Sequence, residues 1–106
     1  MGVCSGVDLK FEYPSDFHHI VFDLDDDHKQ KVGHTFKPSF EFIEETRKKT
    51  NVLVHCAAGI SRCSTLLIAY MMQKYGIRYD ECLKKIQNAR QCCQPNMSFV
   101  KQLKQF

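Results

Sequence analysis

The sequence lacks the features of several classes of protein. It has no hydrophobic run long enough to span a membrane and no segment of signal-peptide type. The net charge is only +3 at pH 7, and we interpret the scattered lysines as solvated helix faces. We therefore expect neither a membrane nor a nucleic acid as a partner.

The cysteines lack the spacing of a secreted disulfide framework or a zinc site. There are six, at positions 4, 56, 63, 82, 92 and 93, and the adjacent pair Cys92 and Cys93 is poorly placed for such a framework. No Cys-x-x-Cys pair and no cluster of histidines occurs, so we expect no metal and no cofactor. A reducing compartment, the cytoplasm or the nucleus, suits this pattern.

The length and composition suit one small domain. With 106 residues, 43% of them hydrophobic, the chain can form one modest core. No repeat or linker interrupts the sequence. We expect a single domain over residues 1–106.

What the sequence does contain is a cysteine and an arginine six positions apart. Residues 55–64 read HCAAGISRCS, after an apolar run at 52–54 and before an apolar stretch that begins at Leu66. This pattern predicts a strand, a short loop and a helix. Small residues between Cys56 and Arg62 let the backbone curl so that its N–H groups point at one centre. We expect a phosphate or another oxyanion to bind there, held by Ala57, Ala58, Gly59, Ile60, Ser61 and Arg62.

The same loop favours a reactive thiolate. The start of a helix and the guanidinium of Arg62 both place positive charge near Cys56, and we expect this field to lower the pKa of its thiol. A thiolate there can attack phosphorus, while Arg62 grips two equatorial oxygens. The residues alone therefore predict phosphoryl transfer through a phosphocysteine.

The segment 52–70, VLVHCAAGISRCSTLLIAY, resembles the active-site loop of the dual specificity protein phosphatases. That family pattern is His-Cys, five residues, Arg, then Ser or Thr, and the resemblance extends through residues 36–43 and 95–103. It implies an α/β fold with a small central sheet flanked by helices on both faces, and phosphoprotein substrates carrying phosphotyrosine and phosphoserine or phosphothreonine. The chain is short for this family at its N-terminal side, so we expect exposed strand edges and a possible homodimer.

The resemblance also assigns roles to residues outside the loop. The family uses an aspartate as general acid, and residues 23–29, DLDDDHK, form an acidic run that can supply it. Alignment on His28 and Lys29 selects Asp26, with Asp25 and Asp27 as the neighbouring alternatives. Crowded carboxylates disfavour full ionisation, which suits proton donation by one member of the cluster. The supporting residues that the resemblance implies are His55, which braces the loop, and Asn96, for which a helix N-cap is a compatible reading.

The sequence departs from the family pattern at Cys63, where Ser or Thr is usual. A thiol is a weaker hydrogen-bond donor than a hydroxyl, so we expect slower hydrolysis of the phosphocysteine. Ser64 can substitute only if the helix starts one position later. A second hypothesis for Cys63 is a reversible disulfide with Cys56 after oxidation.

The pattern also predicts where the elements lie. We expect a strand near Val3 or over residues 20–22, an acidic loop, a strand over 52–55 and a turn at Gly76. The expected helices cover about 38–49, 62–75 and 79–91, and the stretch after Pro95 to residue 102.

Two other functions stay open beside a phosphatase. One is a catalytically weak or inactive phosphate-binding module, and the other is a redox or arsenate-handling thiol enzyme with a similar loop. The absence of charge at Ala57, Ala58 and Ile60 favours a protein substrate over a phosphoinositide.

Overall fold

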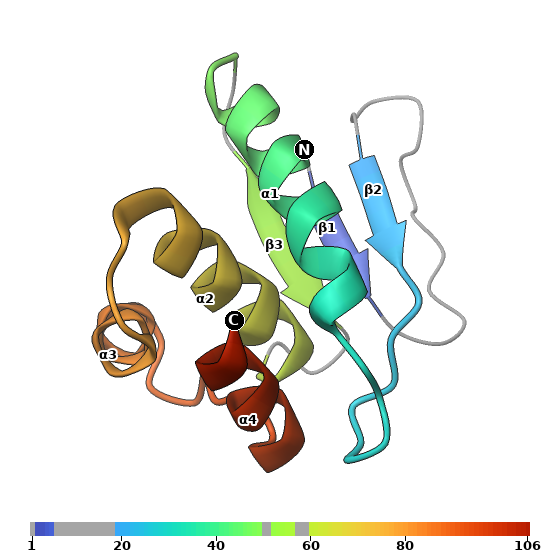
Figure 1. Cartoon of the computed structure of the whole chain (residues 1–106). Coiled ribbons are helices and arrows are strands. Elements are labelled where there is room, and N and C mark those ends of the chain that lie inside the picture. The colour runs from blue at the N-terminus through green and yellow to red at the C-terminus, as the bar shows by residue number, and fades with distance from the viewer. Residues whose placement is uncertain (1, 6–18, 50–51, 57–59) are drawn as a thin grey trace.

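The described part of the chain forms three strands and four helices (Figure 1). The computed structural model describes residues 2–5, 19–49, 52–56 and 60–106. In chain order the elements are β1 (Gly2–Ser5), β2 (His19–Phe22), α1 (Gly33–Arg47), β3 (Leu53–Cys56), α2 (Arg62–Tyr75), α3 (Tyr79–Ala89) and α4 (Met97–Gln105). None of the helices described is long and apolar enough to cross a membrane.

The three strands are parallel, with β1 between β2 and β3. Ser5, the last residue of β1, lies opposite Phe22 and Cys56, which end the other two strands. All three carboxyl ends therefore meet at one edge, the lower edge in Figure 1. Residues 23–32, which we call the acidic segment, follow β2, and the cysteine loop follows β3. Both start from this edge.

Helices α1 and α2 cover the same face of the sheet (Figure 1). Ile43 of α1 and Leu66 and Tyr70 of α2 form a buried cluster, against which Ile20 and Val54 of the sheet pack. The fold is α/β, as predicted. We predicted helices on both faces of the sheet. Within the ranges that the structure describes, α1 and α2 lie on one face, and no helix lies on the other.

A second buried cluster holds the remaining helices on α2. Ile68 of α2, Cys82 of α3 and Phe99 of α4 are each fully buried there. Leu24 and Val32, which lie between β2 and α1, are buried in the same cluster. Burial of an aliphatic or aromatic side chain of this size contributes about 1.5–3 kcal/mol. The core therefore anchors both ends of the acidic segment.

The element boundaries follow the predictions closely at α2 and less closely at α1. Helix α2 covers Arg62–Tyr75, as predicted, and ends at Gly76 in the left-handed conformation, with φ of 65°. Helix α1 begins at Gly33, not at Pro38, and Pro38 lies inside it. The earlier start is stabilised by Thr35, which is buried and donates its hydroxyl and its backbone N–H to the Val32 carbonyl.

The other ends shift by a few residues. Strand β3 is displaced by one residue from the predicted 52–55, so that Cys56 is its last residue. Helix α3 ends at Ala89, two residues before the predicted end, and α4 continues to Gln105, beyond the predicted residue 102. The predicted helix ended one residue before Leu103. Leu103 is fully buried, and its packing in the core explains why the helix continues.

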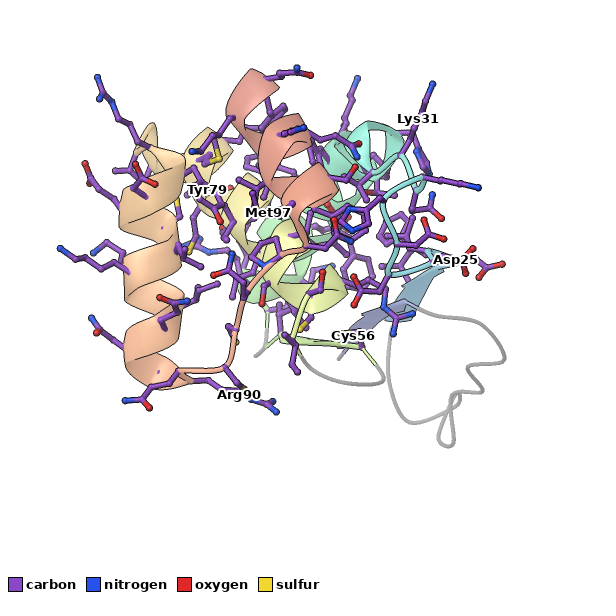
Figure 2. All side chains as sticks on the ribbon, turned by 90° about the horizontal axis from the view of Figure 1, so that it is seen from below. Asp25, Lys31, Cys56, Tyr79, Arg90 and Met97 are labelled. Atoms are coloured by element: carbon purple, nitrogen blue, oxygen red, sulfur yellow. The ribbon has the colours of Figure 1, made fainter. Side chains whose placement is uncertain are left out.

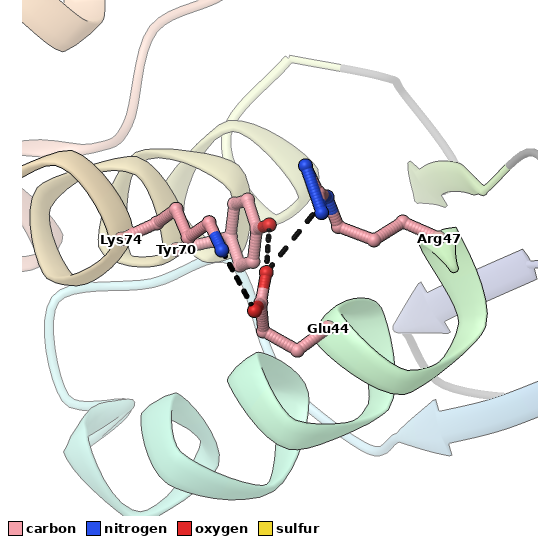
Figure 3. Close-up of polar contacts among 4 residues, drawn as sticks. All are labelled: Glu44, Arg47, Tyr70 and Lys74. Atoms are coloured by element: carbon pink, nitrogen blue, oxygen red, sulfur yellow. Dashed lines mark hydrogen bonds and ion pairs between the residues drawn. The ribbon is translucent and has the colours of Figure 1, made fainter.

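A polar contact joins α1 to α2 (Figure 3). The Glu44 carboxylate accepts hydrogen bonds from the Tyr70 hydroxyl at 2.5 Å and from the Lys74 ammonium at 2.9 Å, and Arg47 Nε lies 3.8 Å from it. These contacts lower the pKa of Glu44, with the Tyr70 hydrogen bond as the largest cause. Burial, followed by the bond to Glu44, raises the pKa of Tyr70 to about 12.

Candidate active site

The site predicted from the sequence lies at the carboxyl edge of the sheet. Figure 2 shows the molecule from below, facing this edge, with Cys56 and Asp25 labelled. Cys56 is the last residue of β3 and is buried, and Arg62 is the first residue of α2. A strand that ends at the cysteine and a helix that begins at the arginine are the context that the sequence pattern predicts.

Arg62 lies between the cysteine loop and the acidic segment. Its Nη1 donates a hydrogen bond to the carbonyl of Leu24 at 3.1 Å, which fixes the guanidinium against the backbone beside the acidic run. Its Nε is buried and has no hydrogen-bond partner among the residues that the structure describes. A buried guanidinium nitrogen normally finds an acceptor, and an oxyanion suits this position.

The end of the cysteine loop is held by a segment far along the chain. The Ile60 carbonyl accepts a hydrogen bond from the backbone of Gln94 at 3.0 Å. Ser61 is buried, and its hydroxyl accepts from the backbone N–H of Asn96 at 2.9 Å. The Ser61 carbonyl accepts from the hydroxyl of Thr65 at 2.8 Å, one turn into α2. These bonds fix the backbone at Ile60 and Ser61, where the chain enters α2.

Asn96 caps α4 and contacts both segments of the site. Its Oδ1 accepts from the backbone of Phe99 at 2.9 Å, which makes it the N-cap of α4. Its Nδ2 donates to Asp26 Oδ1 at 2.9 Å and to the Asp27 carbonyl at 3.3 Å. Through its backbone bond to Ser61, the same residue also holds the cysteine loop. Asn96 therefore connects the two segments of the site.

The three candidate acids differ in their contacts. The Asp26 carboxylate is held by the side chain of Asn96. The Asp27 carboxylate instead accepts from the backbone N–H groups of Lys29 and Gln30, both at 2.9 Å, and closes a turn. Asp25 is exposed, and its backbone N–H donates to Gln30. Of the three carboxylates, Asp26 is the one hydrogen-bonded to the residue that holds the loop.

Cys63 lies beside Cys56. Both side chains are buried, and Cys63 is the second residue of α2. A hydrogen bond with Cys56, followed by burial, raises the pKa of the Cys63 thiol, so that Cys63 keeps its proton. Ser64 donates its hydroxyl to the Ile60 carbonyl, so this hydroxyl proton is not directed at Cys56. The Cys63 thiol therefore lies next to the predicted nucleophile.

Some predicted site residues lie outside the described part of the structure. These are Ala57, Ala58 and Gly59 of the loop, whereas His55 is described through its backbone in β3 and not through its side chain. Within the described residues, no group of three or more histidine, cysteine or acidic side chains is arranged to hold a metal. The expected site is therefore described at its two ends, Cys56 and residues 60–63.

Two residues that position the site were not predicted from the sequence. Leu24 acts through its carbonyl, which accepts from Arg62, and an apolar residue gives no polar signal for such a role. Gln94 acts through its backbone N–H at Ile60. The burial of the Leu24 side chain, 1% exposed, explains why its carbonyl is held in place.

Comparison with known proteins agrees with this geometry. The family model described as dual specificity phosphatase, catalytic domain, matches residues 3–106. A probable dual specificity protein phosphatase of Dictyostelium discoideum is 41% identical over 90 residues, which are 85% of this chain and 23% of that protein. This chain thus spans about a quarter of that relative's length.

Solved structures share the same fold. The human tyrosine phosphatase-like serine/threonine/tyrosine-interacting protein superposes with a TM-score of 0.93 at 31% identity, over 98% of this chain and 73% of the other. DUSP15 superposes with a TM-score of 0.91 at 29% identity, over 99% and 68% of the two chains. A cysteine that ends the β3 strand, an arginine that opens α2, and a family match over nearly the whole chain lead to one conclusion: this chain belongs to the dual specificity phosphatase family.

Proposed function

We propose that this protein hydrolyses phosphotyrosine and phosphoserine or phosphothreonine in protein substrates, through a phosphocysteine at Cys56. The observation that carries the proposal is the hydrogen-bonded connection between the two segments of the site. Asn96 holds Asp26 with its side chain and Ser61 with its backbone, and Arg62 donates to Leu24. A nucleophile, an oxyanion-binding residue and a proton donor are thereby kept at one edge of the sheet.

In the first step, the Cys56 thiolate attacks phosphorus and the bond to the leaving oxygen breaks. Asp26 in its protonated form gives its proton to that oxygen, so that the product leaves as a neutral alcohol or phenol. Arg62 and the backbone N–H groups of the loop bind the equatorial oxygens, over which the transition-state charge is spread. The products of this step are phosphocysteine and the dephosphorylated side chain.

In the second step, water attacks the phosphocysteine and Cys56 leaves as a thiolate. Asp26, now a carboxylate, accepts the proton of the water, and inorganic phosphate is released. Cys63 donates a hydrogen bond to the departing sulfur, a role supported by the bond that raises its pKa. A thiol stabilises that charge less well than a hydroxyl, so this step is the slower one in our proposal.

The surroundings of the loop support a protein substrate. Ile60 is 39% exposed at the end of the loop, and Met97, the first residue of α4, is 63% exposed. Neither carries charge that would pair with the additional phosphates of an inositol lipid. We propose that these side chains accept phosphotyrosine as well as the shorter phosphoserine and phosphothreonine.

The test is hydrolysis of an aryl phosphate by the purified protein. We expect turnover that vanadate inhibits and that Cys56→Ser abolishes, with no requirement for a reductant as co-substrate. Phosphate binding without turnover would instead indicate an inactive phosphate-binding module. Turnover that consumes a thiol reductant would indicate a redox or arsenate-handling enzyme.

Location and assembly are part of the proposal. We propose a cytoplasmic or nuclear protein, supported by cysteines without a secretory framework. Strands β2 and β3 are the outer strands of the described sheet, and unpaired strand edges support pairing with a second copy. We also propose that helices cover the second face of the sheet. Sedimentation equilibrium over a range of concentrations tests the pairing.

A further inference from the structure

A pocket with a basic lining lies beside the acidic segment, outside the catalytic residues. It has a volume of about 540 Å³ and lies between residues 28–34 and α4. Four of its lining residues are basic, namely His28, Lys29, Lys31 and His34. Among the residues that the structure describes, no aspartate or glutamate contributes to its lining. We call this feature the basic pocket.

The floor of the basic pocket is held by hydrogen bonds between α4 and the segment before α1. Gln102 of α4 accepts from the backbone of Val32 at 2.8 Å and donates to the Gln30 carbonyl at 2.9 Å. Gln102 also donates to the hydroxyl of Ser98 at 3.3 Å. Because Val32 is fully buried, the segment is anchored in the core on one side and on α4 on the other.

The acidic residues nearest to the basic pocket are turned to other contacts. The Asp27 carboxylate accepts the backbone N–H groups of Lys29 and Gln30, and Asp26 accepts from Asn96. The ammonium groups of Lys29 and Lys31 make no ion pair with the acidic side chains of the described ranges, and both residues are exposed. Their positive charge is therefore available to an external anion.

The basic pocket is close to the site through shared residues. Asn96 holds Asp26 and caps α4, and the next turns of α4 carry Ser98 and Gln102 into the pocket lining. In Figure 2, Lys31 lies on the side of α4 away from α3, on the same segment as Asp25. A substrate chain whose phosphorylated residue occupies the site can therefore continue past Asp26 to the basic pocket.

We propose that the basic pocket binds an anionic side chain of the phosphoprotein substrate, a carboxylate or a second phosphate, located a few residues from the residue that is dephosphorylated. This inference rests on the proposed function and adds a substrate class to it, namely phosphoproteins with a flanking anionic residue. Lys29 and Lys31 provide the attraction, and Gln102 fixes the shape of the pocket. The pocket contributes to substrate binding and not to the chemical step.

The test compares peptides that differ only beside the phosphotyrosine. One set carries Asp or Glu in the flanking positions, a second carries the isosteric Asn or Gln, and a third carries a phosphoserine there. We expect the first and third sets to have a lower KM than the neutral set, by about tenfold at low salt. We expect this preference to shrink at high salt, because salt screens exposed charges.

The variant for this test is Lys29→Glu combined with Lys31→Glu. It should raise KM for the anionic peptides by about tenfold or more, because attraction becomes repulsion. It should leave kcat and the hydrolysis of a small aryl phosphate within about twofold. The matched control is Lys84→Glu with Lys85→Glu on α3, which makes the same change of net charge at exposed positions outside the pocket.

Several outcomes would overturn the inference. Equal KM values for anionic and neutral peptides in the parent protein would do so, as would an equal loss in the Lys84 and Lys85 control. A parallel measurement uses fluorescence anisotropy with the same peptides on Cys56→Ser. If aryl phosphate is not hydrolysed, the proposed function fails, and this binding measurement still decides whether the basic pocket selects anions. If only the carboxylate peptides or only the phosphoserine peptides bind more tightly than the neutral set, that result identifies which anion the basic pocket prefers.

Discussion

The Nδ2 atom of Asn96 donates a hydrogen bond to the Asp26 carboxylate at 2.9 Å, across 70 positions of the sequence. The same asparagine caps α4 and binds Ser61 through its backbone. One residue therefore sets the position of the candidate acid relative to Ser61 at the end of the cysteine loop, through its side chain on one side and its backbone on the other. Changes at either residue should affect catalysis in a way that depends on the leaving group.

The first prediction concerns Asp26. Asp26→Asn removes the proton donor, and we expect kcat to fall by about 100-fold. The loss should be larger for phenyl phosphate than for p-nitrophenyl phosphate, because the better leaving group depends less on protonation. Asp25→Asn and Asp27→Asn are the matched controls and should keep activity within about tenfold. If one of them shows the larger, leaving-group-dependent loss, that residue is the acid.

The second prediction concerns Asn96. Asn96→Asp keeps an oxygen that accepts from Phe99 and so preserves the cap, but it removes the donor to Asp26 and places a like charge beside it. We expect stability near that of the parent, with a fall of about tenfold in kcat that is steeper for poor leaving groups. Asn96→Ala loses the cap as well, which should cost about 1 kcal/mol of unfolding free energy. Equal activity for Asn96→Asp and the parent would contradict a positioning role.

The third prediction concerns the second chemical step. In Cys63→Ser, a hydroxyl replaces the thiol that lies beside Cys56, and a hydroxyl is the stronger donor. We expect phosphocysteine to break down faster in this variant and to accumulate less than in the parent. Rapid-quench kinetics with an aryl phosphate measures this accumulation directly. Absence of phosphoenzyme in the parent would argue against the prediction.

The fourth prediction concerns oxidation. Cys56 and Cys63 are both buried and share a hydrogen bond, so a sulfenic acid on Cys56 has a thiol beside it. Peroxide oxidises Cys56 to the sulfenic acid, and attack by Cys63 then forms a disulfide and releases water. Mass spectrometry should find this link after mild peroxide, with recovery of activity by a dithiol. Cys63→Ser should instead lose activity irreversibly.

The fifth prediction concerns stability and pH. Contacts with Tyr70 and Lys74 lower the pKa of Glu44 below its ordinary value of 4.5, so they stabilise the fold when Glu44 is ionised. This contribution is present above pH 4.5 and is lost as pH falls through the lower, folded-state value. Glu44→Gln should therefore lower Tm at pH 7, and the difference from the parent should shrink steadily as the pH falls below 4.5.

The control for the fifth prediction is the adjacent Glu45→Gln. Glu45 pairs with Lys49 at 3.9 Å, but its side chain is 74% exposed, and exposed pairs contribute little. Its Tm at pH 7 should be close to that of the parent. An equal loss in the two variants would show that the network in Figure 3 does not join α1 to α2 as described.

The sequence by itself determined the features that depend on neighbours along the chain. Helix α2 begins at Arg62 and ends before Gly76 as expected, since apolar periodicity and a glycine C-cap are local signals. The N-cap at Asn96, one of the two compatible readings of that residue, is a local signal of the same kind. Membership of the phosphatase family also follows from residues that are close in sequence, Cys56 to Arg62.

Only the tertiary structure decided which distant groups meet. The three consecutive aspartates at 25–27 look equivalent in sequence, and it is packing against α4 that places the Asp26 carboxylate on Asn96, whereas Asp27 binds its own backbone. The local sequence pattern also does not predict the contact of Arg62 with the Leu24 carbonyl or the basic pocket beside Gln102. The physical reason is that parallel strands bring their carboxyl ends to one edge, so contacts made there join segments that no sequence window contains.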